Sequence, residues 1–160
     1  MRAADAFFDT NVIVYLFSAD AAKADCAEEL IAGGGNISVQ VLNELAAVAR
    51  RRLGMSWREV RDISMQVRAV LRVEPLTAQT HERGMHVAEH IGLSIYDGTI
   101  VASALLAECT TLYTEVLQDG CVIDGQLTIR NPFVSRETRE PRSGPRAPRS
   151  GPRAPKRRRR

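Results

Sequence analysis

The stretch AFFDTNVIVYLF, residues 6–17, sets one acid, Asp9, and one amide, Asn11, into a largely apolar run. Its first residues are typical of a short buried strand that ends at Asp9, and the residues from Asn11 onward continue as one or two helical turns. An ionised carboxylate in apolar surroundings needs a partner to offset its lost hydration. The stretch therefore predicts an α/β chain with an acid at the end of its first strand.

The rest of the chain repeats this alternation. Apolar residues recur at helical spacing in several segments, and Gly33, Gly34 and Gly35 form a break after the first of them. We predict helices over 21–32, 40–53, 56–71, 77–92 and 96–108, and strands or extended segments over 36–39, 72–76, 111–114, 121–125 and 127–133. Strands alternating with helices favour a three-layer α/β/α domain around a mainly parallel sheet.

Charge divides the chain into two unequal parts. Residues 136–160 hold eleven Arg and Lys against two Glu, a net charge of +9. The whole chain has a net charge of +3, so residues 1–135 carry −6. A length of 160 residues with 44% hydrophobic residues fits one globular domain with a sizeable core. We place this domain at residues 1–135, with its boundary near Phe133, and the basic tail at residues 136–160.

The tail contains the sequence PRSGPRA twice in tandem and no large apolar residue. Such a segment cannot bury enough surface to offset its ordering entropy, so we expect it to be disordered. Two interpretations stay open: a sequence-independent contact to nucleic acid or another polyanion, or a low-complexity extension without a role.

Cys26, Cys109 and Cys121 show no paired spacing, which is typical of reduced cysteines in a cytoplasmic protein. No apolar run approaches the roughly 20 residues that a membrane span needs, and we recognise no signal peptide. The sequence therefore predicts a soluble, cytoplasmic protein.

Four acids lie near predicted strand ends, at a helix start or beside an apolar helix face, where burying an ionised carboxylate costs free energy. Ligands of parallel sheets bind outside the carboxyl ends of the strands, which is where Asp9 lies. Glu44 is close to the apolar stripe of its predicted helix, Asp97 begins the helix 96–108, and Asp119 follows the strand 111–114.

Carboxylates gathered from separate elements repel each other unless a cation lies between them. Carboxylate and water are the ligands that Mg²⁺ and Mn²⁺ prefer, and such ions serve phosphoryl displacement by water. Each acid also has a plainer interpretation: Asp9 as a strand-end turn or helix cap, Asp119 as a turn residue, and Asp97 as a helix N-cap. Glu44 could pair with Arg51, Arg52 or an arginine of the next helix. The functional interpretation depends on the four occurring together.

Four segments resemble the PIN domain, specifically the VapC-like toxin ribonucleases of bacterial toxin–antitoxin pairs. They are FFDTNVIVY, SVQVLNELAAVARR, IGLSIYDGTIVASALLAECTTLYTEVLQDG and LTIRNPF, and the likeness covers nearly all of residues 1–133 in motif order and spacing. The resemblance implies an endoribonuclease that depends on Mg²⁺ or Mn²⁺, with a parallel sheet flanked by helices. It also implies an RNA substrate, a homodimer, and silencing by a VapB-like antitoxin.

The resemblance assigns roles to individual residues. Asp9, Glu44 in NEL and Asp97 in YDGTIVASA match the acids that bind the metal, directly or through water, and orient the attacking hydroxide. Thr10 and Asn11 match the usual polar neighbours of the first aspartate.

The chain departs from the family pattern at its fourth acid. The motif usually resembles Thr-Glu-Asp, and the aspartate falls where this sequence has Val116. Either Glu115 or Asp119 substitutes, or three acids suffice, or the nuclease is weakened. The alternative function is thus a degenerate, non-cleaving module that binds RNA or a partner protein. A third candidate, an aspartyl-phosphate phosphatase, usually has a second aspartate where Asn11 stands.

Other residues suggest contacts with RNA or with a partner. Arg50, Arg51 and Arg52 are candidate RNA contacts, although a solvated helix end explains them equally well. The apolar segments 12–17 and 27–31 are candidates for an antitoxin groove. His86 and His90 stand four residues apart on a predicted helix, and we interpret them as polar surface residues.

Overall fold

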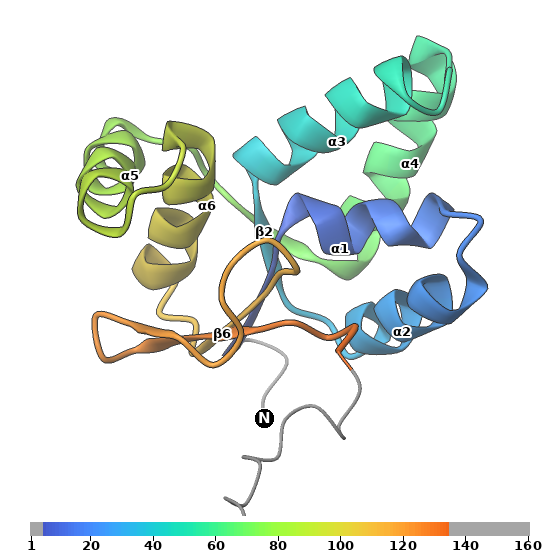
Figure 1. The fold of residues 1–160 in the computed structure, drawn as a ribbon. Coiled ribbons are helices and arrows are strands. Elements are labelled where there is room, and N and C mark those ends of the chain that lie inside the picture. The colour runs from blue at the N-terminus through green and yellow to red at the C-terminus, as the bar shows by residue number, and fades with distance from the viewer. Residues whose placement is uncertain (1–4, 135–160) are drawn as a thin grey trace, which may run out of the picture.

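A six-stranded sheet forms the centre of the computed structural model, which describes residues 5–134 (Figure 1). The strand order is β3-β2-β1-β4-β6-β5, and every pairing is parallel except that of β5 with β6. The strands are β1 Ala6–Phe8, β2 Asn36–Ser38, β3 Arg72–Glu74, β4 Thr111–Tyr113, β5 Val122–Ile123 and β6 Leu127–Arg130. The predicted disorder of the tail 136–160 lies outside the described residues.

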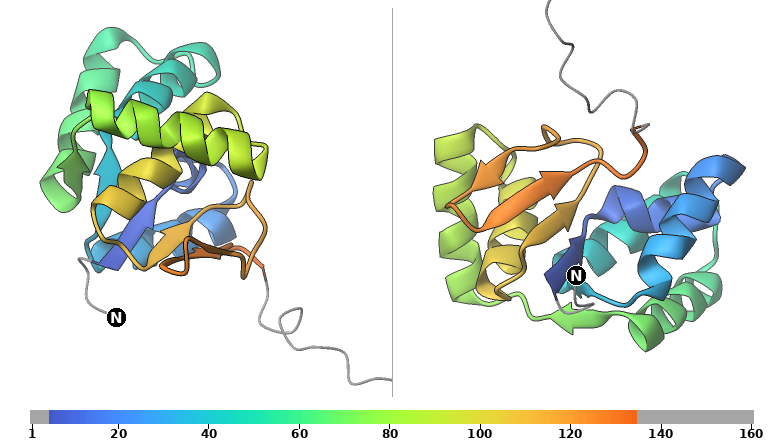
Figure 2. Two further views of the ribbon diagram at one scale, coloured as in Figure 1. Left: turned by 90° about the vertical axis from the view of Figure 1, so that its left-hand side faces the viewer. Right: turned by 90° about the horizontal axis from the view of Figure 1, so that it is seen from below.

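Helices cover both faces of the sheet, which confirms the predicted three-layer α/β/α arrangement (Figures 1 and 2). α1 and α2 lie on one side of the sheet, and α5 and α6 lie together on the other. The helices are α1 Thr10–Val14, the 3₁₀ helix η2 Tyr15–Phe17, α2 Ala21–Ala32, α3 Val39–Arg51, α4 Trp57–Val70, α5 Ala78–Ile91 and α6 Ile95–Leu106. Among the helices of residues 5–134, none combines the length and apolar character that a membrane span requires.

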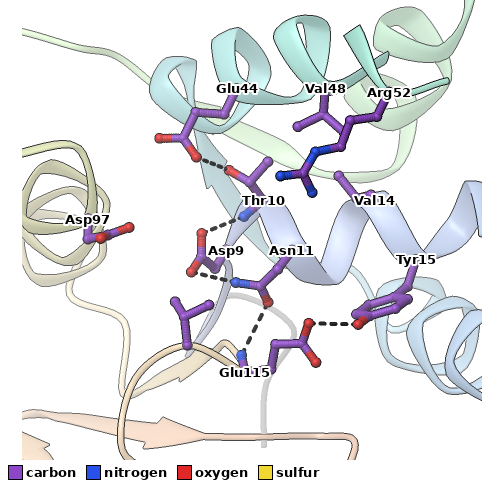
Figure 3. A pocket seen from close by; sticks show the side chains of 11 residues that line it. Asp9, Thr10, Asn11, Val14, Tyr15, Glu44, Val48, Arg52, Asp97 and Glu115 are labelled. Atoms are coloured by element: carbon purple, nitrogen blue, oxygen red, sulfur yellow. Dashed lines mark hydrogen bonds between the residues drawn. The ribbon is translucent and has the colours of Figure 1, made fainter. Parts of the chain in front are cut away.

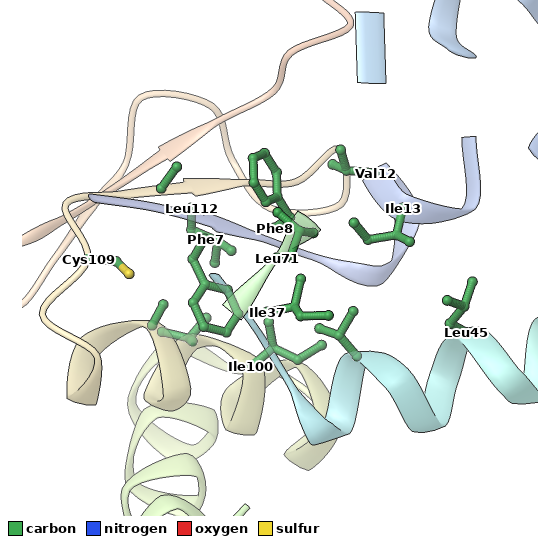
Figure 4. Packing of buried hydrophobic residues seen from close by; sticks show 14 of the residues in the cluster. Phe7, Phe8, Val12, Ile13, Ile37, Leu45, Leu71, Ile100, Cys109 and Leu112 are labelled. Atoms are coloured by element: carbon green, nitrogen blue, oxygen red, sulfur yellow. The ribbon is translucent and has the colours of Figure 1, made fainter. Parts of the chain in front are cut away.

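The core surrounds the central strand β1, whose three residues are all buried (Figure 4). Phe7 is fully buried, as are Ile37 of β2 and Leu112 of β4, the neighbouring strands. Phe8 stacks on Tyr113 of β4, with ring centroids 5.5 Å apart. A parallel strand covered on both faces has no solvent side, which explains why AFF reads as a continuous apolar run.

Two glycines bring α5 and α6 into close contact. A Cβ added to Gly98 would lie 2.5 Å from the carbonyl oxygen of Gly84, and one added to Gly84 would lie 2.8 Å from Oγ1 of Thr99. Larger residues at either position would force the two helices apart. This contact fixes the position of the N-terminal part of α6, which carries Asp97.

The last two strands form a hairpin at the edge of the sheet. Asp124 and Gly125 both have positive φ, 51° and 66°, and the N–H of Gln126 donates to the carbonyl of Ile123 at 3.0 Å. An Asp-Gly pair suits such a turn because both residues tolerate left-handed conformations. The predicted extended segments 121–125 and 127–133 thus contain only a two-residue and a four-residue strand.

The direction of the strand order reverses at β1. From β1 the chain passes to β2 and then β3 on one side, and only afterwards returns to β4 on the other side of β1. Open α/β sheets bind ligands at such a reversal, in the crevice outside the carboxyl ends of the strands. Here that crevice lies where β1 ends at Phe8 and β4 ends at Tyr113.

Candidate functional site

A cavity of about 390 Å³ opens at the carboxyl ends of β1 and β4 (Figure 3). It contains three of the four predicted acids, drawn from three separate parts of the chain. The lining residues are Asp9, Thr10, Asn11, Val14, Tyr15, Glu44, Val48, Arg52, Asp97, Glu115 and Val116.

Asp9 joins β1, α1 and β4 through hydrogen bonds. Its backbone N–H donates to the carbonyl of Tyr113 at 3.0 Å. Its Oδ1 accepts the N–H of Thr10 at 2.6 Å, and its Oδ2 accepts the Asn11 amide at 2.9 Å and the Thr114 hydroxyl at 2.7 Å. The side chain caps α1, as the plainer interpretation of Asp9 predicted, and it also lines the cavity.

The carboxylate of Asp9 is the most buried acid of the cavity. Only 5% of the residue is exposed, and this burial raises its pKa from 3.8 to about 6. The hydrogen bonds from Thr114 and Thr10 lower the pKa, whereas the negative charges of Glu44 and Asp97 raise it. A cation in the cavity would relieve both the desolvation and the repulsion.

Glu44 reaches the cavity from α3 and is held by two polar side chains. Its Oε2 accepts the Thr10 hydroxyl at 2.9 Å, and its Oε1 accepts the Gln40 amide at 3.0 Å. Within residues 5–134 it forms no ion pair, so the predicted alternative of pairing with Arg51, Arg52 or an arginine of the next helix is wrong. Neutral donors orient the carboxylate without neutralising it.

Asp97 faces the cavity from the first turn of α6. The helix starts at Ile95 and its N-cap is Ser94, whose side chain accepts the N–H of Asp97 at 3.1 Å and donates to its Oδ2 at 2.7 Å. The alternative interpretation of Asp97 as the N-cap is therefore wrong. Ser94 takes that position, and its hydroxyl also holds the Asp97 carboxylate.

The three acids share a cavity but do not form a closed metal cage. Among the described residues, no three His, Cys, Asp or Glu side chains stand close enough together to hold an ion. Mg²⁺ is usually bound by only one or two carboxylates and keeps several of its waters. The donor set therefore fits a hydrated Mg²⁺ or Mn²⁺ ion, with Asp9, Glu44 and Asp97 as its ligands or as acceptors for its waters.

The position of the fourth acid is occupied by an apolar side chain. Val116 lines the cavity and is 62% exposed. Glu115 also lines it, but its Oε1 accepts the Tyr15 hydroxyl at 2.7 Å and its Oε2 the Lys23 ammonium at 3.0 Å. Asp119 is absent from the lining and accepts the backbone N–H of Asn131 at 2.7 Å. Neither suggested substitute therefore offers an uncommitted carboxylate to the cavity.

The arginine cluster is split between two environments. Arg52 lines the cavity, whereas Arg50 donates to the carbonyl of Met55 and lies over the Trp57 ring at 5.1 Å from its centroid. His86 and His90 are exposed on α5, with ring centroids 4.0 Å apart, and neither lines this cavity.

Thr114 is the functional residue that sequence reasoning missed. It is fully buried directly after β4, and besides its bond to Asp9 its hydroxyl accepts the Asn11 amide at 3.2 Å and the Val116 N–H at 3.2 Å. A polar residue ending an apolar strand was the available signal. It resembles the signal that drew attention to Asp9.

We predict that, without divalent cations, the free energy of unfolding falls as the pH rises from about 4 to about 6. Asp9 loses its proton near pH 3.8 in the unfolded chain and near pH 6 in the folded chain. The free energy of unfolding is therefore about 3 kcal/mol lower above this window than below it. Urea unfolding in the presence of a chelator, compared with Asp9→Asn, isolates this step. The step should vanish in Asp9→Asn and persist in the control Asp119→Asn. Parallel pH profiles for wild type and Asp9→Asn would refute the assignment.

Comparison with solved structures finds several chains of the same fold. A toxin–antitoxin complex from Klebsiella pneumoniae matches with a TM-score of 0.62 and 21% identity, covering 80% of this chain and 98% of that one. The sarcin-ricin loop cleaving toxin VapC20 of Mycobacterium tuberculosis matches with a TM-score of 0.56 and 25% identity, covering 67% and 86%. VapBC2 of Rickettsia felis, bound to a DNA fragment from its promoter, matches with a TM-score of 0.51 and 22% identity, covering 68% and 86%.

Comparison with curated proteins returned no match. The family model of the PIN domain matches residues 6–115. This segment holds the three cavity acids and their supporting residue Thr114. By the extent of this match, the chain belongs to the PIN domain family.

Proposed function

We propose that this protein is a metal-dependent endoribonuclease and the toxin of a toxin–antitoxin pair. The observation that carries the proposal is the meeting of Asp9, Glu44 and Asp97 in one cavity at the reversal of the sheet. Membership of the PIN family supports it, as does a fold shared with VapC20, a toxin described as cleaving the sarcin-ricin loop. The expected homodimer and cytoplasmic location stay predictions.

In the proposed phosphodiester hydrolysis, some residues of the site bind the metal and others position the metal-binding carboxylates. Asp9, Glu44 and Asp97 would hold Mg²⁺ or Mn²⁺, which when bound supplies a Lewis acid and a lowered pKa for the attacking water. Thr114, Asn11 and Thr10 fix the carboxylates of Asp9 and Glu44 by direct hydrogen bonds. Side chains held this way need no reorganisation when charge develops on the phosphate.

Arg52, the C-cap of α3, is the arginine best placed to meet the substrate. It lines the cavity, and it is the only Arg, Lys or His side chain in a lining drawn from residues 5–134. A guanidinium can bind a phosphate through two parallel hydrogen bonds. We assign Arg52 to the RNA phosphate, ahead of Arg50, whose guanidinium is engaged at the turn between α3 and α4. Arg51 stays a predicted contact.

A second function, a non-cleaving module, is favoured by one observation. Val116 presents an apolar side chain to the cavity where the family resemblance leads us to expect an aspartate. Loss of one acid lowers the charge available to a cation and would weaken or abolish the metal site. Such a module would bind RNA or a partner protein without cutting it.

An apolar groove lined in part by η2, α2 and α4 fits the proposed antitoxin. The groove has a volume of about 420 Å³, and its lining is Leu16, Phe17, Glu28, Ile31, Ala32, Gln66, Val67, Val70 and Leu71. Leu16, Phe17 and Ile31 come from the two predicted segments, whereas Val12 is fully buried in the core. The proposal is supported by the toxin–antitoxin complexes among the similar structures.

Metal-dependent RNA cleavage by the antitoxin-free protein is the first test. We expect Asp97→Asn and Glu44→Gln to lower the cleavage rate by at least about 100-fold, because metal stabilisation of the transition state is worth several kcal/mol. The rate is measured on total bacterial RNA with Mg²⁺ or Mn²⁺. Asp119→Asn, which removes a carboxylate outside the cavity, should retain wild-type activity. If wild type and both variants were folded and equally inert, the proposal would be refuted.

Val116→Asp separates the enzyme from the degenerate module. A competent nuclease should change its cleavage rate by no more than about tenfold, since its three acids already suffice. A degenerate module should instead acquire metal-dependent cleavage from an undetectable background. Val116→Asn serves as the control because it adds a polar side chain of the same size without the charge. Activity that appears only in Val116→Asp would establish the second function.

The antitoxin groove is tested by a charge placed on α4. Val70 is 52% exposed and lines the groove, so Val70→Glu should reduce co-purification of the proposed antitoxin at least about tenfold. Met65→Glu on the same helix, at a position that is 61% exposed and outside the groove lining, is the control. Equal recovery with both variants would place the antitoxin elsewhere.

A further inference from the structure

The end of the described chain is fastened to η2 and α2. The Phe133 ring meets the Tyr15 ring edge-on, with centroids 4.7 Å apart. The Lys23 ammonium lies 4.4 Å from the Tyr15 centroid and 5.2 Å from that of Phe133, and the Cys26 thiol donates to the carbonyl of Pro132 at 3.5 Å. Aromatic and cation–π contacts of this kind hold a chain segment in place. Phe133, Tyr15 and Lys23 are called the anchor below.

The anchor borders the cavity of Asp9, Glu44 and Asp97, called the acidic cavity below, through Tyr15. Tyr15 lines the cavity itself, and its hydroxyl donates to Glu115, another lining residue, at 2.7 Å. Lys23 donates to both Tyr15 and Glu115. Phe133, one residue before the end of the described chain, is therefore linked to the cavity through the side chain of Tyr15.

Charge and length match this segment to the cavity. The cavity contains Asp9, Glu44 and Asp97, of which neither Glu44 nor Asp97 has an ion-pair partner among residues 5–134. Residues 136–160 contain eleven Arg and Lys. An extended residue spans at most about 3.6 Å, so the 25 residues 136–160 have a long reach from the anchor.

We propose that arginines of residues 136–160 occupy the acidic cavity of their own chain and compete there with the divalent cation. The inference rests on the proposed function, since it assigns a regulator to the same site. RNA, as a polyanion, draws the tail out of the cavity and admits the ion together with the substrate. The tail thereby makes metal binding depend on the presence of RNA.

The physical case depends on tethering. A guanidinium binds a free carboxylate weakly in water, but a short tether raises its effective concentration to the order of millimolar or more. Two or more carboxylates around one guanidinium strengthen the contact through parallel hydrogen bonds. The attraction is screened by salt, so competition should be strong at low ionic strength and fade at about 0.5 M salt.

Binding of Mn²⁺ to the full chain tests the proposal without reference to activity. A variant in which all eleven Arg and Lys of residues 136–160 are Gln should bind Mn²⁺ about three- to tenfold more tightly than wild type at low salt. The difference should disappear at about 0.5 M salt, as followed by electron paramagnetic resonance of free Mn²⁺. Equal affinities at low salt would overturn the proposal. Mn²⁺ binding that is absent from wild type and variant alike would refute both this proposal and the proposed function.

A control removes the effect of net charge alone. Arg58, Arg61 and Arg68 are exposed on α4, and their replacement by Gln lowers the positive charge outside the tail. Competition within the cavity requires a larger gain in Mn²⁺ affinity per charge from the tail than from α4. Equal gains per charge would mean that only long-range electrostatics acts, and the proposal would fail while the metal site stood.

Cross-linking locates the contact directly. With the tail arginines changed to Lys, the charge is kept, and a zero-length carbodiimide reagent joins a lysine only to a carboxylate in contact with it. Cross-links of the monomeric full chain should concentrate on Glu44 and Asp97 and decrease when RNA is added. Cross-links spread evenly over exposed acids such as Glu28, Glu82 and Glu89 would overturn the proposal.

Discussion

The structure depends on the hydrogen bond by which Thr114, directly after β4, donates to the buried carboxylate of Asp9, directly after β1. These two strands are neighbours in the sheet but about a hundred residues apart in the chain. The same carboxylate caps α1 and faces the cavity. One carboxylate thus links the ends of two neighbouring strands, caps a helix and is the most buried acid of the site. The free-energy cost of burying it therefore affects both the stability of the fold and the chemistry of the site.

Much of this arrangement could be predicted from local patterns. The strand ending at Asp9, the helix ending before Gly33, the helices after Ser56 and Thr77, and the parallel α/β layers all appear in the sequence as apolar periodicity with breaking and capping residues. The assignment of Asp9, Glu44 and Asp97 to one rim was also possible, because parallel strands bring their carboxyl ends to the same edge. The structure places all three in the same cavity.

What could not be predicted depends on contacts between distant segments. The role of Thr114 requires the register of β1 against β4, and the engagement of Glu115 requires Lys23 and Tyr15 to reach it across the fold. The bond of Asp119 to Asn131 likewise follows from the meeting of two chain segments after β4 and β6. Asp97 was interpreted as an N-cap, but Ser94, three residues earlier, takes that position with an extended backbone conformation that local patterns did not reveal.

The structure of the loop at Val116 bears on how such a protein evolves. The loop is held by neighbours of Val116: Thr114 is fully buried and Glu115 is fastened to Lys23 and Tyr15, while Val116 contributes its backbone N–H. The side chain at position 116 is therefore under little selection from the fold. Valine and aspartate codons differ by one nucleotide, so a lineage can lose or regain the fourth acid in one step without crossing a fold-disrupting intermediate. Substitution at position 116 can therefore alter the proposed activity with little effect on the stability of the fold.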